Sequence, residues 1–308
     1  MSVNGIHHMT AIAGNAQGNV DFYSGVLGLR LVKRTVNFDD PLTYHLYYGT
    51  ELGAPGTILT FFAWPNAYRG RMGSGQVNAT ALAVPKGSLG WWEERFMTLR
   101  VKHDLPLKRF GEEVLPFQDG DGMQLELVAA EDGRPPWKGG AVPEQHAIRG
   151  VYGVTAHEEG YEMTAQLLTE TLLFKPVGQE GNRFRYQAGP TAGIIDLLCT
   201  PDGPRSRGGA GVVHHVAWRV PNDADQLAWR KTVVGAGMNV SPVLDRQYFH
   251  SIYFREPGGV LFEIATDEPG FATDEPAEKL GQALKLPPWL EGAREQIEAG
   301  LEPITLPG

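Results

Sequence analysis

The stretch Gly5-Ile6-His7-His8-Met9-Thr10-Ala11, near the start of the chain, carries a pattern that returns three more times. The later copies lie at residues 76–81, 151–156 and 213–217. When the copies are aligned on their Thr or Ala, the position of His8 corresponds in turn to Asn78, Gly153 and His215, at spacings of 70, 75 and 62 residues. Internal similarity at a roughly constant period is typical of one structural unit used repeatedly.

Each copy is followed by residues with helical spacing and then by short strand-like runs. After the first copy, Val20, Tyr23 and Leu27 are spaced for one face of a helix. Similar helices are expected around residues 88–96, 161–172 and 224–235, the second of them with Ser88 as its N-cap. Strand-like runs follow, for example at residues 44–48, 58–64, 183–187 and 248–254. We therefore predict an α+β protein built from four βαβββ modules.

The modules group into two domains along the chain. The expected boundaries are residues 1–140 for modules one and two and residues 146–269 for modules three and four. Residues 270–308 lie outside the repeat, and Pro287-Pro288 divides them into two short helical pieces. We expect this segment to form a C-terminal helical tail.

Composition excludes several classes of protein. Among 308 residues, 36 acidic and 27 basic side chains give a net charge of −9 without a basic patch, which argues against a nucleic-acid partner. No apolar run approaches the roughly 20 residues that span a bilayer, and the first residues lack the pattern of a leader peptide. The single cysteine, Cys199, excludes an internal disulfide and a Cys-rich metal site. We expect a cytoplasmic protein with no membrane partner, and a homo-oligomer remains open.

A carboxylate in the last module adds chemistry to the repeat. Glu263 lies inside an apolar strand, four residues after Gly259. The same count in the first three modules reaches Thr60, Glu126 and Leu197. His8, His215 and Glu263 together supply two imidazoles and one carboxylate, the facial triad typical of non-haem Fe(II) oxygenases. Thr60 stands where a second carboxylate would complete a four-ligand cage, and Glu126, whose module has Asn78 in place of a histidine, is expected to make a structural hydrogen bond.

Each candidate histidine has a histidine neighbour, His7 beside His8 and His214 beside His215. Strand alternation places His8 and Thr10 on one face and His7 on the other, but it does not say which face is inward. One member of each pair can bind a metal while the other supports its ring from behind. Because the ligands come from modules one and four, we expect module one to pair with module four and module two with module three.

These motifs resemble the vicinal oxygen chelate superfamily, whose βαβββ units pair into metal-holding cups. More closely, the chain resembles the ring-cleaving dioxygenases that open hydroquinones. The resemblance covers nearly the whole sequence and is carried by residues 5–10, 44–49, 55–62, 214–217 and 286–289 together with the Pro-Gly-Gly-x-x-x-Glu strand. It implies two vicinal oxygen chelate domains and an enzyme that acts on a small aromatic substrate with O2.

The resemblance also implies roles for individual residues. The second histidine of each pair and the glutamate would hold Fe(II), with Mn(II) as an alternative metal, which assigns His8, His215 and Glu263 as ligands. The pocket and supporting positions of the family correspond to His7, His214, Thr10, Arg246 and Tyr253. Among these, Tyr253 and His214 are candidates for proton delivery. Arg246 could stabilise negative charge or orient Tyr253.

Three other functions stay open at this point. A catechol extradiol dioxygenase would use the same triad, since the sequence does not encode the hydroxyl pattern of the substrate. A glyoxalase-type isomerase with zinc or nickel favours two carboxylates, and Thr60 counts against it. A metal-independent protein that binds an aromatic compound needs no His/His/Glu set, so the presence of all three residues argues against that class.

Overall fold

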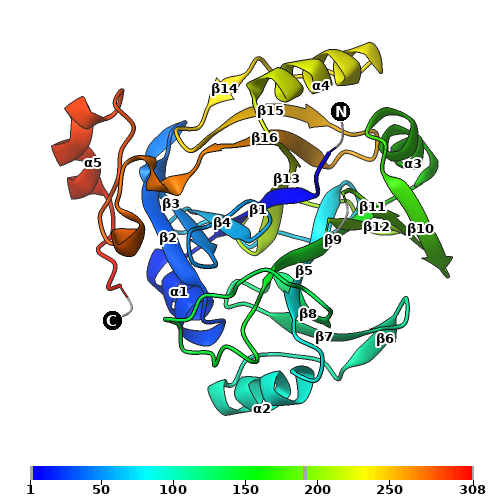
Figure 1. The fold of residues 1–308 in the computed structure, drawn as a ribbon, viewed down its shortest axis with the longest axis horizontal. Helices are drawn as coiled ribbons and strands as arrows, with labels where there is room; N and C mark the ends of the chain where they lie inside the picture. Colours follow the sequence, from blue (N-terminus) through cyan, green and yellow to red (C-terminus); the bar gives the residue numbers. More distant parts are fainter. Residues whose placement is uncertain (1–2, 190–192, 307–308) are drawn as a thin grey trace.

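Two curled sheets, each with eight strands, form the body of the protein in a computed structural model (Figure 1). The structure describes residues 3–189 and 193–306, so the outer ends of the predicted ranges, residues 1–2 and 307–308, lie outside the described residues. The observed architecture confirms the predicted α+β class and the four-module repeat. The sequence-based boundaries at residues 140 and 146 stay a prediction.

The first sheet joins modules one and four, which lie at opposite ends of the chain. Its strands run in the order β14-β15-β16-β13-β1-β4-β3-β2. They span Leu244–Asp245 (β14), Phe249–Arg255 (β15), Leu261–Pro269 (β16), Val212–Val220 (β13), Ile6–Ala13 (β1), Ile58–Ala63 (β4), Asp40–Gly49 (β3) and Arg30–Asn37 (β2). The two modules meet through antiparallel pairing of β1 with β13. The predicted pairing of module one with module four is therefore confirmed.

The second sheet joins modules two and three in the same way. Its order is β10-β11-β12-β9-β5-β8-β7-β6. The strands span Lys175–Glu180 (β10), Arg183–Gln187 (β11), Ile194–Cys199 (β12), Gly150–Glu158 (β9), Gln76–Val84 (β5), Gln124–Ala129 (β8), Glu112–Gln118 (β7) and Leu107–Arg109 (β6). Here β5 and β9 form the antiparallel seam, which completes the predicted arrangement.

Each module has one helical segment, at the predicted place. The first and third are short and end in a π-helical turn: α1 (Ala16–Val20) with η1 (Asp21–Val26), and α3 (Glu162–Gln166) with η2 (Leu167–Thr171). The second and fourth are α2 (Leu89–Leu99) and α4 (Asp223–Gly235). Ser88 occupies the predicted N-cap position of α2, but its side chain makes no capping hydrogen bond, because its hydroxyl donates to the carbonyl of Gln145 instead.

The C-terminal tail packs beside β2 and β3 (Figure 1). It contains the short 3-10 helices η3 (Phe271–Thr273), η4 (Ala277–Lys279) and η5 (Glu291–Ala293) and the helix α5 (Arg294–Gly300). Pro287 and Pro288 lie between η4 and η5, as the predicted division into two helical pieces requires. Among the described residues, none of the helices is both long and apolar enough to cross a membrane.

Candidate metal centre and aromatic pocket

Two β-bulges at the seam between modules one and four arrange the paired histidines. Along β1 and β13, Ile6 faces Trp218 and His8 faces Ala217, so His7 is the extra residue of one bulge. Further along, Thr10 faces His215 and Ala11 faces Val213, which makes His214 the extra residue of the other. A bulge bends the strand and re-aims its side chains. In each pair, the second histidine (His8 or His215) therefore keeps its place in the strand register, whereas the first (His7 or His214) is the bulged residue.

The predicted ligands His8, His215 and Glu263 converge at this seam. Their ligand atoms all lie within 4.8 Å of one another, and all three residues are buried. Nε2 of His8 lies 3.3 Å from Nε2 of His215. Oε2 of Glu263 lies 3.3 Å from Nε2 of His8 and 2.8 Å from Nε2 of His215. The other carboxylate oxygen, Oε1, accepts a hydrogen bond from the buried Ser251. Among the described residues this is the only cluster with the composition of a metal site.

The displaced histidines support the rings of the converging ones. Nδ1 of His7 lies 2.8 Å from Nδ1 of His8, and Nδ1 of His214 lies 2.7 Å from Nδ1 of His215. Burial, followed by the neighbouring imidazole, lowers the pKa of His214 to about 3, so its ring is neutral. If His8 and His215 donate from Nδ1, their Nε2 lone pairs point at the cluster, which is the tautomer that metal ligation requires.

The donor atoms fit a divalent cation. Glu263 Oε2 is buried and has no hydrogen bond among the described residues, although two imidazole nitrogens face it. Burial alone would raise the pKa of this carboxyl, and in the absence of a metal the two imidazoles hold it well below its usual range when they are protonated. With both rings neutral and unprotonated at Nε2, as metal ligation requires, this stabilisation is lost. Two lone pairs and a carboxylate at such distances repel one another unless a cation lies between them. Two imidazoles and one carboxylate suit Fe(II), Mn(II) or Zn(II).

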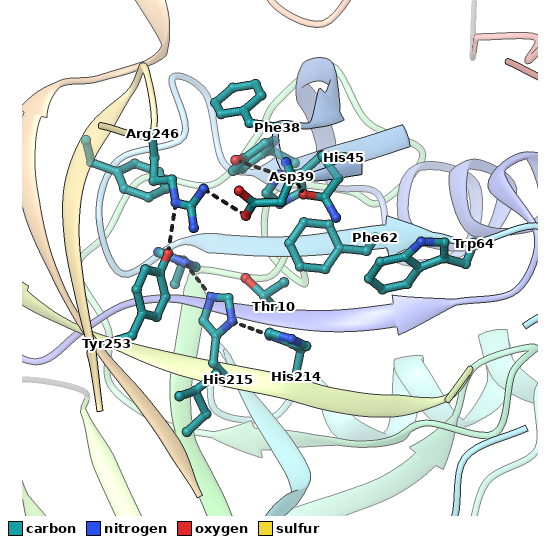
Figure 2. A pocket seen from close by; sticks show the side chains of 15 residues that line it. Thr10, Phe38, Asp39, His45, Phe62, Trp64, His214, His215, Arg246 and Tyr253 are labelled. Atoms are coloured by element: carbon teal, nitrogen blue, oxygen red, sulfur yellow. Dashed lines mark hydrogen bonds and ion pairs between the residues drawn. The ribbon is translucent and has the colours of Figure 1, made fainter. Parts of the chain in front are cut away.

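A cavity of about 320 Å³ opens beside the cluster (Figure 2). Its walls are largely aromatic, and its lining includes Phe38, Tyr47, Phe62, Trp64 and Phe249. His8 and His215 reach its surface, as does the predicted pocket residue Thr10. Such a combination of flat apolar walls and a few polar groups is suited to a small aromatic ring.

Arg246 and Tyr253 lie together on one wall of the cavity, as Figure 2 shows. Nε of Arg246 donates to the Tyr253 hydroxyl at 3.3 Å, and another of its nitrogens pairs with Asp39 at 3.1 Å. Burial and the Glu263 carboxylate raise the pKa of Tyr253, so the phenol keeps its proton. Because the Tyr253 oxygen accepts from Arg246, its own hydrogen is free to point into the cavity.

The two supporting histidines, His7 and His214, differ in whether they reach the cavity. His214 lines the cavity, whereas His7 is buried against His8 and Phe249 and does not reach it. Sequence reasoning missed three neighbours of the site: Ser251 beside Glu263, Asp39 beside Arg246, and His45 in the cavity wall. Of these, only His45 had a signal, because it alternates with Tyr47 along a strand-like run.

At the equivalent place in the second sheet, the described residues leave only a small space. There Glu126 forms a bidentate pair with Arg109, which confirms its predicted structural role. The prediction that Leu197 is the module-three equivalent of Glu263 is wrong by one residue. Asp196 holds that position, because it pairs with Thr155 on β9 as Glu263 pairs with Ala217 on β13. The reason is that β12 begins directly after Gly193, whereas β16 begins two residues after Gly259. Asp196 pairs with Arg183 and Arg185, and a space of only about 10 Å³ remains.

The model of the glyoxalase/bleomycin resistance protein/dioxygenase superfamily matches residues 5–127 and 153–264. The chain belongs to this superfamily. It is 51% identical over 304 residues to a Bacillus subtilis (strain 168) protein named "Putative ring-cleaving dioxygenase MhqO", covering 98% of this chain and 97% of that one. It is 38% identical over 305 residues to the chlorohydroquinone/hydroquinone 1,2-dioxygenase of Sphingobium indicum, covering 96% and 95% of the two chains.

Solved structures of superfamily members agree with this assignment. The crystal structure of a "putative dioxygenase" from Bacillus subtilis superimposes with a TM-score of 0.96 at 49% identity and covers 99% of both chains. Glyoxalase I from Zea mays superimposes with a TM-score of 0.64 at 14% identity, over 85% of this chain and 92% of that one. The second likeness concerns the fold alone. The relatives named above support an oxygenase as the class of enzyme.

Proposed function

We propose that this protein is an Fe(II)-dependent dioxygenase that cleaves the ring of a hydroquinone-type aromatic compound. The observation that carries the proposal is the triad of His8, His215 and Glu263 at the edge of an aromatic cavity. A facial set of three ligands leaves room on the metal for a substrate oxygen and for dioxygen. The full-length similarity to a chlorohydroquinone/hydroquinone 1,2-dioxygenase favours this substrate class.

The metal, when bound, supplies Lewis acidity that lowers the pKa of a coordinated phenol and brings dioxygen and the ring together. The chain supplies the surroundings. The aromatic walls hold the flat ring and exclude water, and His7 and His214 keep the ligand rings oriented through their Nδ1 atoms. Mn(II) would suit the same donors.

Three groups can then donate hydrogen bonds to oxygen atoms that gain negative charge during the reaction. The Tyr253 hydroxyl is held by Arg246 and keeps its proton, as described above. If His215 donates from Nδ1 to Nδ1 of His214, the neutral His214 ring carries its proton on Nε2. The hydroxyl of Thr10 lies in the same cavity wall. Donors fixed before the reaction lower the barrier most effectively, because they need no reorganisation.

Oxygen consumption tests the proposal directly. The protein is reconstituted with Fe(II) under anaerobic conditions and mixed with oxygenated methylhydroquinone or catechol. We expect uptake with the hydroquinone and its loss in His215→Ala, with loss of bound iron measured in the same samples. Uptake with catechol alone would move the protein to the extradiol class. Iron-loaded protein that consumes oxygen with neither compound would refute the proposed substrate class.

A further inference from the structure

A row of side chains crosses four neighbouring strands of the first sheet and ends in the cavity. His215 on β13 faces Thr10 on β1, Thr10 faces Thr60 on β4, and Thr60 faces Tyr47 on β3. His45 lies two residues before Tyr47 and therefore on the same face. Figure 2 shows Thr10 between His215 and the wall formed by Phe62 and His45. The register of the sheet thus connects the metal cluster with a buried polar group on a distant strand.

Hydrogen bonds join Tyr47, His45, Thr60 and Thr10 in turn. The Tyr47 hydroxyl lies 2.9 Å from His45 Nδ1, and His45 Nε2 lies 2.6 Å from Thr60 Oγ1. Thr60 in turn donates to Thr10 Oγ1 at 3.0 Å. Thr60 is fully buried, and His45 and Tyr47 are almost so. A chain of buried hydrogen bonds of this kind fixes the orientation of each member.

The direction of the chain follows from its donors. Because Thr60 uses its hydrogen on Thr10, the proton of the short contact with His45 must come from His45 Nε2. Burial lowers the pKa of His45 well below its usual value, so the ring is neutral and Nδ1 has a lone pair. The Tyr47 hydroxyl, whose pKa burial raises, donates to that lone pair. All the hydrogens therefore point from Tyr47 towards Thr10.

We propose that Tyr47, His45 and Thr60 form a positioning relay that turns the hydroxyl hydrogen of Thr10 into the cavity. Thr10 Oγ1 accepts from Thr60, and no other hydrogen bond of this hydroxyl is found among the described residues. Its hydrogen is left to donate to a substrate-derived oxygen beside His215. The kinetic part of this inference rests on the proposed ring-cleaving function, whereas the direction of the relay does not.

A double-mutant cycle tests the kinetic part. Thr60→Val keeps the shape of the side chain and removes the donor that orients Thr10. We expect it to lower kcat by about 5- to 10-fold, with a smaller change in KM, as Thr10→Val does. If the relay acts through Thr10, the double variant is no slower than Thr10→Val. Effects that multiply in the double variant, or a Thr60→Val variant with normal kcat, would overturn the relay.

The chain offers a matched control. Thr80 lies on β5, the seam strand of the second sheet, next to Ala81, which corresponds to Thr10 by strand register. Thr80 is fully buried with no hydrogen bond for its hydroxyl among the described residues. Thr80→Val makes the same change in the second sheet, so we expect normal kcat and KM. The iron content of every variant is measured alongside.

The tautomer of His45 provides a readout that does not need turnover. The full chain with isotope-labelled histidine is loaded with diamagnetic Zn(II), and the ring nitrogens are observed by NMR. We expect His45 to be protonated at Nε2 and not at Nδ1, and its Nε2 signal to shift in Thr60→Val but not in Thr80→Val. Protonation at Nδ1 reverses the relay and refutes it. A wild-type enzyme that is inactive on both diols, with His45 protonated at Nε2, would refute the proposed function but not the relay's direction.

Discussion

Ser251 illustrates how much a metal site depends on a residue that does not bind the metal. Glu263 is fully buried, and only one of its two carboxylate oxygens faces the histidines. The other accepts the Ser251 hydroxyl, which comes from the neighbouring strand β15. This bond prevents the carboxylate from rotating, so Oε2 stays directed at the cluster.

We therefore expect Ser251→Ala to weaken metal binding without unfolding the protein. Loss of a partner that orients a ligand commonly costs about 10- to 100-fold in metal affinity. Anaerobic calorimetric titration with Fe(II) or Mn(II) measures the change. The control is Thr98→Ala, which removes an exposed hydroxyl from α2 and should leave the affinity unchanged. Equal affinities in Ser251→Ala and the wild type would show that packing alone holds Glu263.

The candidate site could be predicted from the sequence only where the repeat and the resemblance carried it. His8, His215 and Glu263 lie at related places in the modules, and the structure brings them together. Ser251 and Asp39 have no sequence signal, because a single hydroxyl or carboxylate on a strand or turn is ordinary. Their partners are defined only by strand register and by the contact between modules one and four.

At the scale of elements, one buried lysine attaches the C-terminal tail to the first sheet. Lys33 on β2 is fully buried, and its Nζ lies 2.5 Å from both Asp274 and Glu275. The Glu275 carboxylate also accepts from the backbone of Gly281 and Ala283, so it shapes the turn that follows. The sequence predicted a helical tail but not this contact, since Lys33 has no feature that distinguishes it from a surface lysine.

Replacing Lys33 by Met should destabilise the protein and loosen the tail. It leaves two carboxylates with little exposure and no cation, and breaking a buried ion pair from one side costs about 3–5 kcal/mol. Urea unfolding measures the free energy, and limited proteolysis shows whether residues 270–306 are cut first. Lys86→Met breaks the exposed pair with Glu131 and should leave the free energy of unfolding almost unchanged, because exposed ion pairs contribute little. Equal losses in the two variants would contradict this role of Lys33.

At the scale of the whole molecule, the fold joins the first module to the last. This pairing could be predicted because the metal ligands come from modules one and four, and a site needs its ligands close together. The two sheets differ in what fills the equivalent place, a metal cluster and cavity in the first and ion pairs in the second. This difference could be predicted only in part. Glu126 had no histidine partner, but the arginines that fill the second cup could not be assigned to it from the chain alone.

Where the two sheets meet, one buried carboxyl group from module three lies near one from module four. Glu158 ends β9, and Glu256 follows β15. Glu256 accepts from the backbone of Gly258 and Val260 and from the Thr164 hydroxyl. Neither oxygen of Glu158 has a hydrogen bond among the described residues. Burial and then the charge on Glu256 raise the pKa of Glu158 to about 9, so it is protonated in the folded state.

This pair should make the protein less stable as the pH rises. The folded chain holds a proton on Glu158 that the unfolded chain releases near the ordinary value of 4.5, so the folded state binds more protons between pH 4.5 and about 9. The contribution to the free energy of unfolding is therefore fully present below that window and lost across it, by at most about 1.4 kcal/mol per pH unit. The physical cause is the burial of Glu158, followed by repulsion from the charge on Glu256.

Glu158→Met removes the titrating group and retains its length. A buried polar group without a partner can be replaced by an apolar one of similar shape at little cost. We expect the variant to gain stability relative to the wild type as the pH rises, with a larger difference in urea unfolding at about pH 8 than at about pH 5. Glu94→Met, on the exposed face of α2, makes the same chemical change away from the junction and serves as the control. Parallel pH profiles for Glu158→Met and the wild type would mean that Glu158 does not hold its proton, and the junction between the sheets would then tolerate two charges.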